Sequence, residues 1–257
     1  MTAKHSGVAK LWLLNLVGNA ALLAAVYFWL QLPDAHGWQV AGTALVAVIV
    51  IFFGLWLRTG TFAYFRVAEF RDRAAVWRAF RHALRHMLGL LVWALLFAVL
   101  AWLLWRLRTY TPQAGVWLRQ KLNAGPAPRN VTRDLNWLLV LLWLVLLAIW
   151  LPIGTTIAAA GFRLKRMARS LRVLRRPAYW LWFFALVFVG AYVPYRLVWW
   201  IPELDDLRKQ AWSMGLRFLA AYVILISAFV ALVLVVGTRT EKEDSDPIAL
   251  SPNSPTQ

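Results

Sequence analysis

Six long stretches without Asp, Glu, Lys or Arg dominate the sequence. They comprise residues 11–33, 35–57, 86–105, 135–162, 177–195 and 218–238. A helix needs about 20 apolar residues to cross the hydrocarbon core of a bilayer, and each stretch approaches or exceeds that length. Hydrophobic residues make up 61% of the chain and charged residues only 15%, which is more apolar surface than a soluble domain buries. The sequence therefore predicts an all-α, polytopic integral membrane protein.

One transmembrane domain, residues 1–237, is expected to contain six membrane-spanning helices. Their predicted limits are 11–32, 38–57, 87–107, 135–157, 178–200 and 212–236. The first helix differs from a cleavable signal peptide because its apolar run is too long and Trp29 and Leu30 stand where small residues would precede a cleavage site. Residues 238–257 become acidic and then rich in Ser and Pro, so they are expected to form a disordered cytoplasmic tail.

The positions of the basic residues predict the orientation of the chain. Linkers 58–85 and 163–176 are rich in arginine and poor in acids. The positive-inside rule then places both linkers and both termini on the cytoplasmic side. Loop 106–134 is an exception, because it is also basic and falls on the predicted outer side. Arginine greatly outnumbers lysine, as in proteins from GC-rich bacterial genomes, and we expect a protein of the bacterial inner (plasma) membrane.

Both basic linkers have the pattern of amphipathic helices. In each, apolar residues recur at helical spacing and basic residues fall on the opposite side, which is typical of a helix on a membrane surface. Such a face attracts anionic lipid headgroups by about 1 kcal/mol per basic residue, and a membrane or peripheral protein partner is the alternative. The predicted binding residues are Arg71, Arg78, Arg85, Lys165, Arg169, Arg172 and Arg176. The leading hypothesis is a non-catalytic membrane component that binds partners or anionic lipids.

A second group of arginines lies at the predicted outer face and could form an anion pocket. Arginine suits carboxylate or phosphate groups, and aromatic neighbours could wall such a site. The candidate residues are Arg106, Arg196, Arg217, Tyr192, Tyr195 and Trp199. The alternative function is therefore a permease or channel-like protein for a small or lipidic anion. The structural alternative is that these arginines extend to the interface and are offset by Glu203, Asp205 and Asp206.

The residues inside the six stretches suggest packing more than transport. No Asp or Glu lies within them, which argues against a proton relay or a mid-membrane carboxylate site. Amides and hydroxyls are present and are expected to bridge helices. They are Asn15, Asn19, Thr43, Thr155, Thr156 and Ser227. Residues 85–112 and 175–202 also share a pattern of basic start, apolar run and aromatic end, which fits either a duplicated unit or the common design of membrane helices.

The sequence contains no motif of a known enzyme or cofactor site. It lacks cysteine, a phosphate-binding glycine loop, an HExxH motif and a serine, histidine and acid set. His82 and His86 lie one helical turn apart but lack a third metal ligand. The segment 199–206 resembles the tryptophan and aspartate motif of haem-handling proteins, but the axial histidines are missing. We therefore expect no enzymatic activity, cofactor or metal. The net charge of +17 comes largely from the basic linkers between the apolar stretches. We therefore do not expect the protein to bind nucleic acid.

Overall fold

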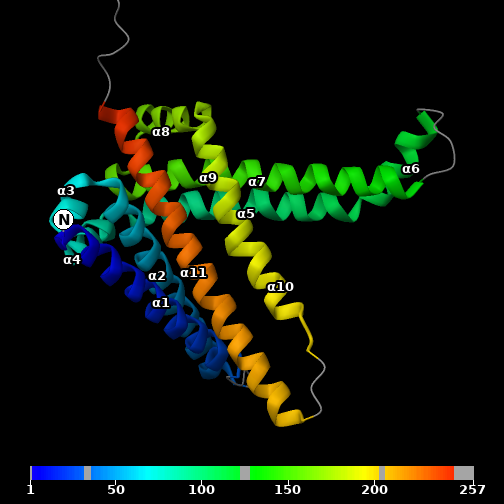
Figure 1. Cartoon of the computed structure of the whole chain (residues 1–257), viewed down its shortest axis with the longest axis horizontal. Helices are drawn as coiled ribbons and strands as arrows, with labels where there is room; N and C mark the ends of the chain where they lie inside the picture. The colour runs from blue at the N-terminus through cyan, green and yellow to red at the C-terminus, as the bar shows by residue number, and fades with distance from the viewer. Residues whose placement is uncertain (1, 32–35, 122–127, 203–205, 246–257) are drawn as a thin grey trace, which may run out of the picture. The chain divides into compact units, whose positions relative to one another are not determined.

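The computed structural model describes residues 2–31, 36–121, 128–202 and 206–245, which form helices and no strands (Figure 1). The α-helices are α1 (Thr2–Trp29), α2 (Gly37–Arg66), α3 (Ala68–Asp72), α4 (Val76–Leu84), α5 (Met87–Thr109), α6 (Thr111–Lys121), α7 (Pro128–Ala160), α8 (Leu164–Ser170), α9 (Pro177–Val187), α10 (Val193–Trp199) and α11 (Leu207–Ser245). A 3₁₀ turn, η1 (Leu171–Arg175), and a π-helical turn, η2 (Phe188–Tyr192), complete the chain.

Six segments are long and apolar enough to cross a bilayer. They are Ser6–Trp29, Gly37–Arg66, Met87–Thr109, Val131–Ala160, Pro177–Trp199 and Leu207–Thr240. The predicted all-α architecture with six membrane-spanning helices is thereby confirmed. The protein is a multi-pass helical membrane protein.

Helices α2 and α11 run furthest past their predicted C-terminal ends. Helix α2 continues past its predicted end at residue 57 to Arg66, because the residues that follow are packed against protein and almost all are buried. Helix α11 runs from Leu207 to Ser245, so the first residues of the predicted tail are helical. The remainder of that tail, 246–257, lies outside the described residues.

The described residues form two compact units. The first contains the residues up to Leu90 and those from Pro152 onward, and the second contains Leu91–Leu151. The divisions thus fall within α5 and within α7. In α7 the second division coincides with a proline, whose carbonyl oxygen accepts hydrogen bonds from the hydroxyls of Thr155 and Thr156, both at 2.9 Å.

The core of the first unit lies where α2 meets α4 and α11. Helix α2 contacts α1, α4 and α11, and α11 also contacts α1, α8, α9 and η2. Phe62, Phe65 and Phe80 are fully buried in this region. Gly237 of α11 approaches α2 so closely that an added Cβ would lie 2.9 Å from the carbonyl carbon of Phe65. Small residues at such crossings let membrane helices pack at short distance.

The fifth span is built from three helical pieces, α9, η2 and α10. Pro194, just after η2, lacks an N–H group, and its ring crowds the carbonyl group four residues earlier, which a wider π turn relieves. Helix α10 ends where the Trp200 N–H donates to the Arg196 carbonyl at 3.0 Å. Helix α11 then begins after Asp206, whose side chain accepts a hydrogen bond from the Arg208 N–H at 3.0 Å, as an N-cap residue does.

The second unit is an antiparallel pair of helices, α5 and α7, joined through α6. The Trp93 indole N–H donates to the Trp150 carbonyl at 3.2 Å. The ring of Phe97 lies 5.2 Å from that of Trp150 and 6.0 Å from that of Trp143. Many apolar side chains of the two helices within this unit are exposed, as expected for helices that face lipid.

We predict that Gly237→Ala weakens the contact between α11 and α2. The added methyl group would overlap the backbone of Phe65, which cannot rotate away, and overpacking of this kind costs about 1–3 kcal/mol. The matched control is Gly215→Ala on the same helix, where no atom of the described chain lies within 4 Å of the added Cβ. Thermal unfolding in mild detergent measures both variants, and equal midpoints would contradict the close approach.

Candidate functional site

The first basic linker forms α3 and α4, and α2 holds α4 in place. Ala79, Phe80 and Ala83 of α4 are buried, whereas Arg78 and Arg85 are exposed. The Trp56 indole N–H donates to the Phe80 carbonyl at 3.0 Å, and the two rings lie 5.3 Å apart. Much of the apolar face of α4 therefore packs on protein, and its basic face points away from the core. Contact of this helix with a lipid leaflet stays a prediction.

The second basic linker forms α8 and η1, which contact α11. Met167, Ser170 and Val173 are buried, and the basic residues between them are exposed. The Trp180 indole N–H donates to the Leu174 carbonyl at 2.8 Å and so fixes the end of the linker to α9. In Figure 1, α3, α4, α8 and the last turns of α11 gather at one end of the first unit.

These two linkers bring the predicted binding residues to one end of the first unit. Six of them are exposed, namely Arg78, Arg85, Lys165, Arg169, Arg172 and Arg176. Arg71 is half-buried and donates to the Phe65 carbonyl at 3.1 Å, so it also holds the end of α2. Glu69 lies 3.2 Å from Arg73 and 4.0 Å from Arg78 in exposed ion pairs, which contribute little stability. We name the six exposed residues the basic surface.

The two histidines of the first linker, His82 and His86, lie in ring contact with each other. Their rings are 4.9 Å apart, and the His82 Nε2–H donates to the Ala159 carbonyl at 2.9 Å. Burial lowers the pKa of His86, and the nearby charges of His82, Arg85 and Arg163 lower it further. His86 is therefore neutral at pH 7. Among the described residues no group of three or more potential metal ligands includes this pair.

A cluster of polar side chains lies inside the first unit, between α1, α2 and α11. Arg58 of α2 donates from Nη2 to Asn19 Oδ1 at 2.7 Å, and its guanidinium carbon lies 4.2 Å from the centre of the Phe229 ring. Its Nη1 is buried and has no hydrogen-bond partner among the described residues. The Asn15 amide donates to Thr61 Oγ1 at 3.0 Å one turn further along.

Two more hydrogen bonds extend this cluster to α11. The Trp12 indole N–H donates to Ser227 Oγ at 2.9 Å, and the Tyr222 hydroxyl donates to the Leu16 carbonyl. The bridging role predicted for Asn15, Asn19 and Ser227 matches these contacts.

Arg58 is a residue that the sequence did not single out. The sequence predicts that the second span ends at residue 57, which places Arg58 at the start of linker 58–85. In the structure it belongs to the span Gly37–Arg66. An ionisable side chain within a span is a candidate functional residue by default. One sequence feature indicates a polar partner for Arg58. Asn15 and Asn19 are one helical turn apart, which places two amides on the same face of α1.

The residues of the predicted anion pocket do not all line one cavity. Tyr192, Arg196 and Trp199 line a pocket of about 490 Å³ on η2 and α10. Tyr195 is not part of its lining, although its ring lies 5.9 Å from that of Trp199. Arg217 lines a different pocket of about 460 Å³.

The remaining contacts of these arginines are local. The Arg217 Nε–H donates to the Ser213 carbonyl at 3.1 Å. Arg106 belongs to the second unit, where its guanidinium carbon lies 5.7 Å from the centre of the Trp102 ring. Asp206 caps α11, and Glu203 and Asp205 lie outside the described residues. The sequence thus singled out two arginines that line pockets, Arg196 and Arg217, without predicting that the two pockets are separate.

Comparison of the chain with protein-family models, with curated proteins and with solved structures finds no match. The function is therefore proposed from the chemistry of these sites alone.

We predict unequal effects of removing the two partners of the hydrogen bond between Arg58 and Asn19. Asn19→Leu leaves a buried guanidinium without its acceptor and should reduce the free energy of unfolding by about 3–5 kcal/mol. Arg58→Met removes the charge and replaces it with apolar volume, so its effect should be close to neutral. The double variant should resemble Arg58→Met. Unfolding in mixed detergent micelles measures all three, and a double variant as unstable as Asn19→Leu would refute the pairing.

Proposed function

We propose that this chain is a non-catalytic component of a bacterial inner membrane that binds anionic lipid headgroups through the basic surface, with both termini in the cytoplasm. The single observation that carries the proposal is the exposure of Arg78, Arg85, Lys165, Arg169, Arg172 and Arg176 at one end of the first unit. Each basic side chain near an anionic membrane surface adds about 1 kcal/mol of attraction. A protein partner with an acidic face could use the same surface.

Packing supports this proposal because it holds the basic residues in fixed positions. Helix α4 is attached to α2 through Trp56 and Phe80, and α8 and η1 contact α11. The exposed side chains therefore project from anchored backbone. Lysine and arginine side chains retain much of their rotamer freedom when they contact headgroups, so little ordering cost accompanies binding.

Neutralising four of the six residues of the basic surface tests the proposal. Lys165, Arg169, Arg172 and Arg176 are changed together to Gln, and the lipids and proteins that co-purify in mild detergent are identified by mass spectrometry. We expect the variant to lose most of the anionic phospholipid that the wild-type chain retains, because four favourable charges are removed. The matched control changes Arg208 and Lys209 to Gln at the start of α11.

Three results are informative. An unchanged lipid complement in the four-site variant would refute lipid binding by this surface. Loss of a stoichiometric protein in place of lipid would identify a protein partner as the ligand. An equal loss of lipid in the control would show that total charge matters and that the basic surface has no special role.

An anion permease or channel-like protein is the second candidate, and Arg58 is the observation that favours it. A fixed cation within a span attracts anions. In anion pores, several arginine or lysine side chains arranged in a ring around the pore have this role. The Arg58 Nη1 group is buried and has no hydrogen-bond partner among the described residues, so an anion would reach this donor only after α1, α2 and α11 move apart. The outer pockets with Arg196 and Arg217 would supply an entrance.

Chloride flux into vesicles that contain the purified chain tests this candidate. If the chain conducts anions, Arg58→Gln should abolish the flux and the double variant Arg196→Gln/Arg217→Gln should reduce it. A chloride-quenched dye inside the vesicles reports the rate. Flux equal to that of protein-free vesicles would exclude a chloride pathway, and flux that survives all three changes would separate conduction from these arginines.

A further inference from the structure

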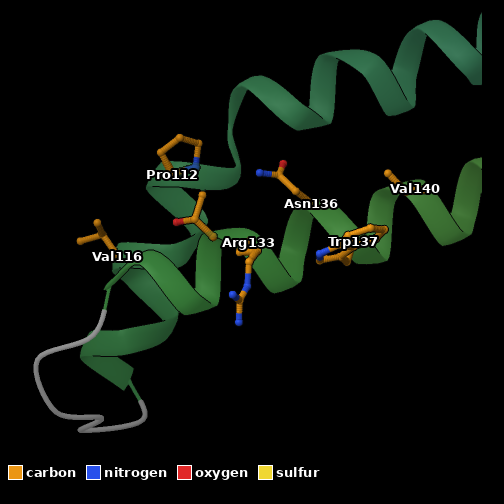
Figure 2. A pocket seen from close by; sticks show the side chains of 7 residues that line it. Pro112, Val116, Arg133, Asn136, Trp137 and Val140 are labelled. Atoms are coloured by element: carbon orange, nitrogen blue, oxygen red, sulfur yellow. The ribbon is translucent and has the colours of Figure 1, made fainter. Parts of the chain in front are cut away.

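The second unit contains a pocket of its own, between α6 and the start of α7 (Figure 2). Its volume is about 620 Å³. Pro112 and Val116 line it from α6, and Arg133, Asn136, Trp137 and Val140 line it from α7. Figure 2 shows the Asn136 amide pointing toward α6, whereas the Arg133 side chain leaves α7 in a different direction, away from Asn136. The pocket therefore combines an apolar wall with hydrogen-bond donors.

Specific contacts between α6 and α7 shape this pocket. The Thr111 hydroxyl lies 2.8 Å from the Arg108 carbonyl oxygen and 3.2 Å from Asn136 Oδ1, so its one proton is shared between two acceptors. Gly115 faces α7 so closely that an added Cβ would lie 2.8 Å from Thr132 Oγ1. The Asn136 side chain also carries two amide N–H groups. Those groups, the Trp137 indole N–H and the Arg133 guanidinium are the donors available to a ligand.

The charges around the pocket are almost all positive. Arg106 lies over Trp102, Arg108 over Trp105 and Lys121 over Trp117, at 5.7, 5.8 and 5.9 Å from the ring centres. The Arg133 Nε lies 3.9 Å from Asp134 Oδ1, in an ion pair whose side chains are 68% and 71% exposed. The described side chains of residues 106–134 thus carry four cations and one carboxylate. Such a site favours an anion.

We propose that this pocket binds one anionic phospholipid. Its phosphate would accept hydrogen bonds from Asn136, Trp137 and Arg133, because donors that include a cation suit phosphate oxygens. Its acyl chain would extend along Val140 and the exposed leucines of the next turns of α7, Leu138 and Leu141.

The position of the pocket favours a lipid over a soluble anion. It opens beside a membrane-spanning segment, Val131–Ala160, and its apolar lining continues into that segment. Tryptophan rings beside cations are typical of the headgroup layer of a bilayer. A free phosphate ion would use the donors and gain nothing from the apolar wall.

This site is separate from the basic surface. Helix α5 begins at Met87, just after the first basic linker, and ends at Thr109, just before the pocket. A helix of this length spans roughly 35 Å, which is about the thickness of a bilayer core. The proposal stands whether or not the basic surface binds lipid.

Photo-crosslinking tests the proposal on the full chain. The protein is reconstituted in phosphatidylcholine vesicles that contain a photoactivatable phosphatidylglycerol, and crosslinked peptides are identified by mass spectrometry. We expect labelling of α6 and of the first turns of α7. Asn136→Asp retains an oxygen for Thr111 but replaces the amide donor with a negative charge, and should reduce this labelling about tenfold. Arg133→Gln, which leaves the α6–α7 contact intact, should reduce it several-fold.

Three controls make the result specific. Arg172→Gln on the basic surface should leave labelling at α6 and α7 unchanged, which separates this site from the proposed function. A photoactivatable phosphatidylcholine should label the segment much less than phosphatidylglycerol does. Equal labelling by the two lipids, or labelling that both pocket variants leave unaltered, would overturn the proposal. Complete competition by inorganic phosphate would overturn the assignment of a lipid and identify a soluble phosphate as the ligand.

Discussion

A single guanidinium group inside the bundle determines how the first unit can pack. A charged side chain within a span must find partners, because leaving water without compensation is costly. Arg58 finds a hydrogen-bond acceptor, Asn19, on α1 and an aromatic face, Phe229, on α11. One side chain of α2 thus specifies the positions of two other spanning helices. The hydrogen bond between Asn15 and Thr61 repeats the α1–α2 contact one turn away and makes its register unambiguous.

The tryptophans contribute to the same packing in a way that composition does not reveal. An indole near a helix end is expected in the headgroup layer. Here the N–H groups of Trp12, Trp29, Trp56 and Trp180 donate to Ser227, Thr43, Phe80 and Leu174 respectively. Each of these bonds joins residues of different helices or linkers. By contrast, Trp38 is 74% exposed and Trp199 is 69% exposed, as residues of an interfacial belt would be.

The six spans could be predicted from sequence because charge-free runs of this length have few alternative structures. Sequence and structure differ at features that depend on contacts between helices, which local sequence patterns do not determine. The charge of Arg58 predicts that the second span ends at residue 57. Only the folded bundle shows that Asn19 and Phe229 contact this side chain inside the span. The π turn before Pro194 depends on packing against α11, where a Cβ on Gly190 would lie 2.8 Å from that of Ala228. Likewise, no sequence pattern separates the pocket of Arg196 from that of Arg217, because the separation depends on how α10 and α11 pair.

Basic residues occur near both ends of α5, and this weakens any orientation based on counting charges. The rule that basic loops are cytoplasmic treats each Lys or Arg as a free charge. In loop 106–134, however, Arg106, Arg108 and Lys121 lie over indole rings, which attract cations at an interface regardless of side. If an anionic lipid headgroup occupies the pocket beside them, their charge is neutralised locally. The basic character of this loop would then be a property of a binding site, and the orientation would depend on linkers 58–85 and 163–176 alone.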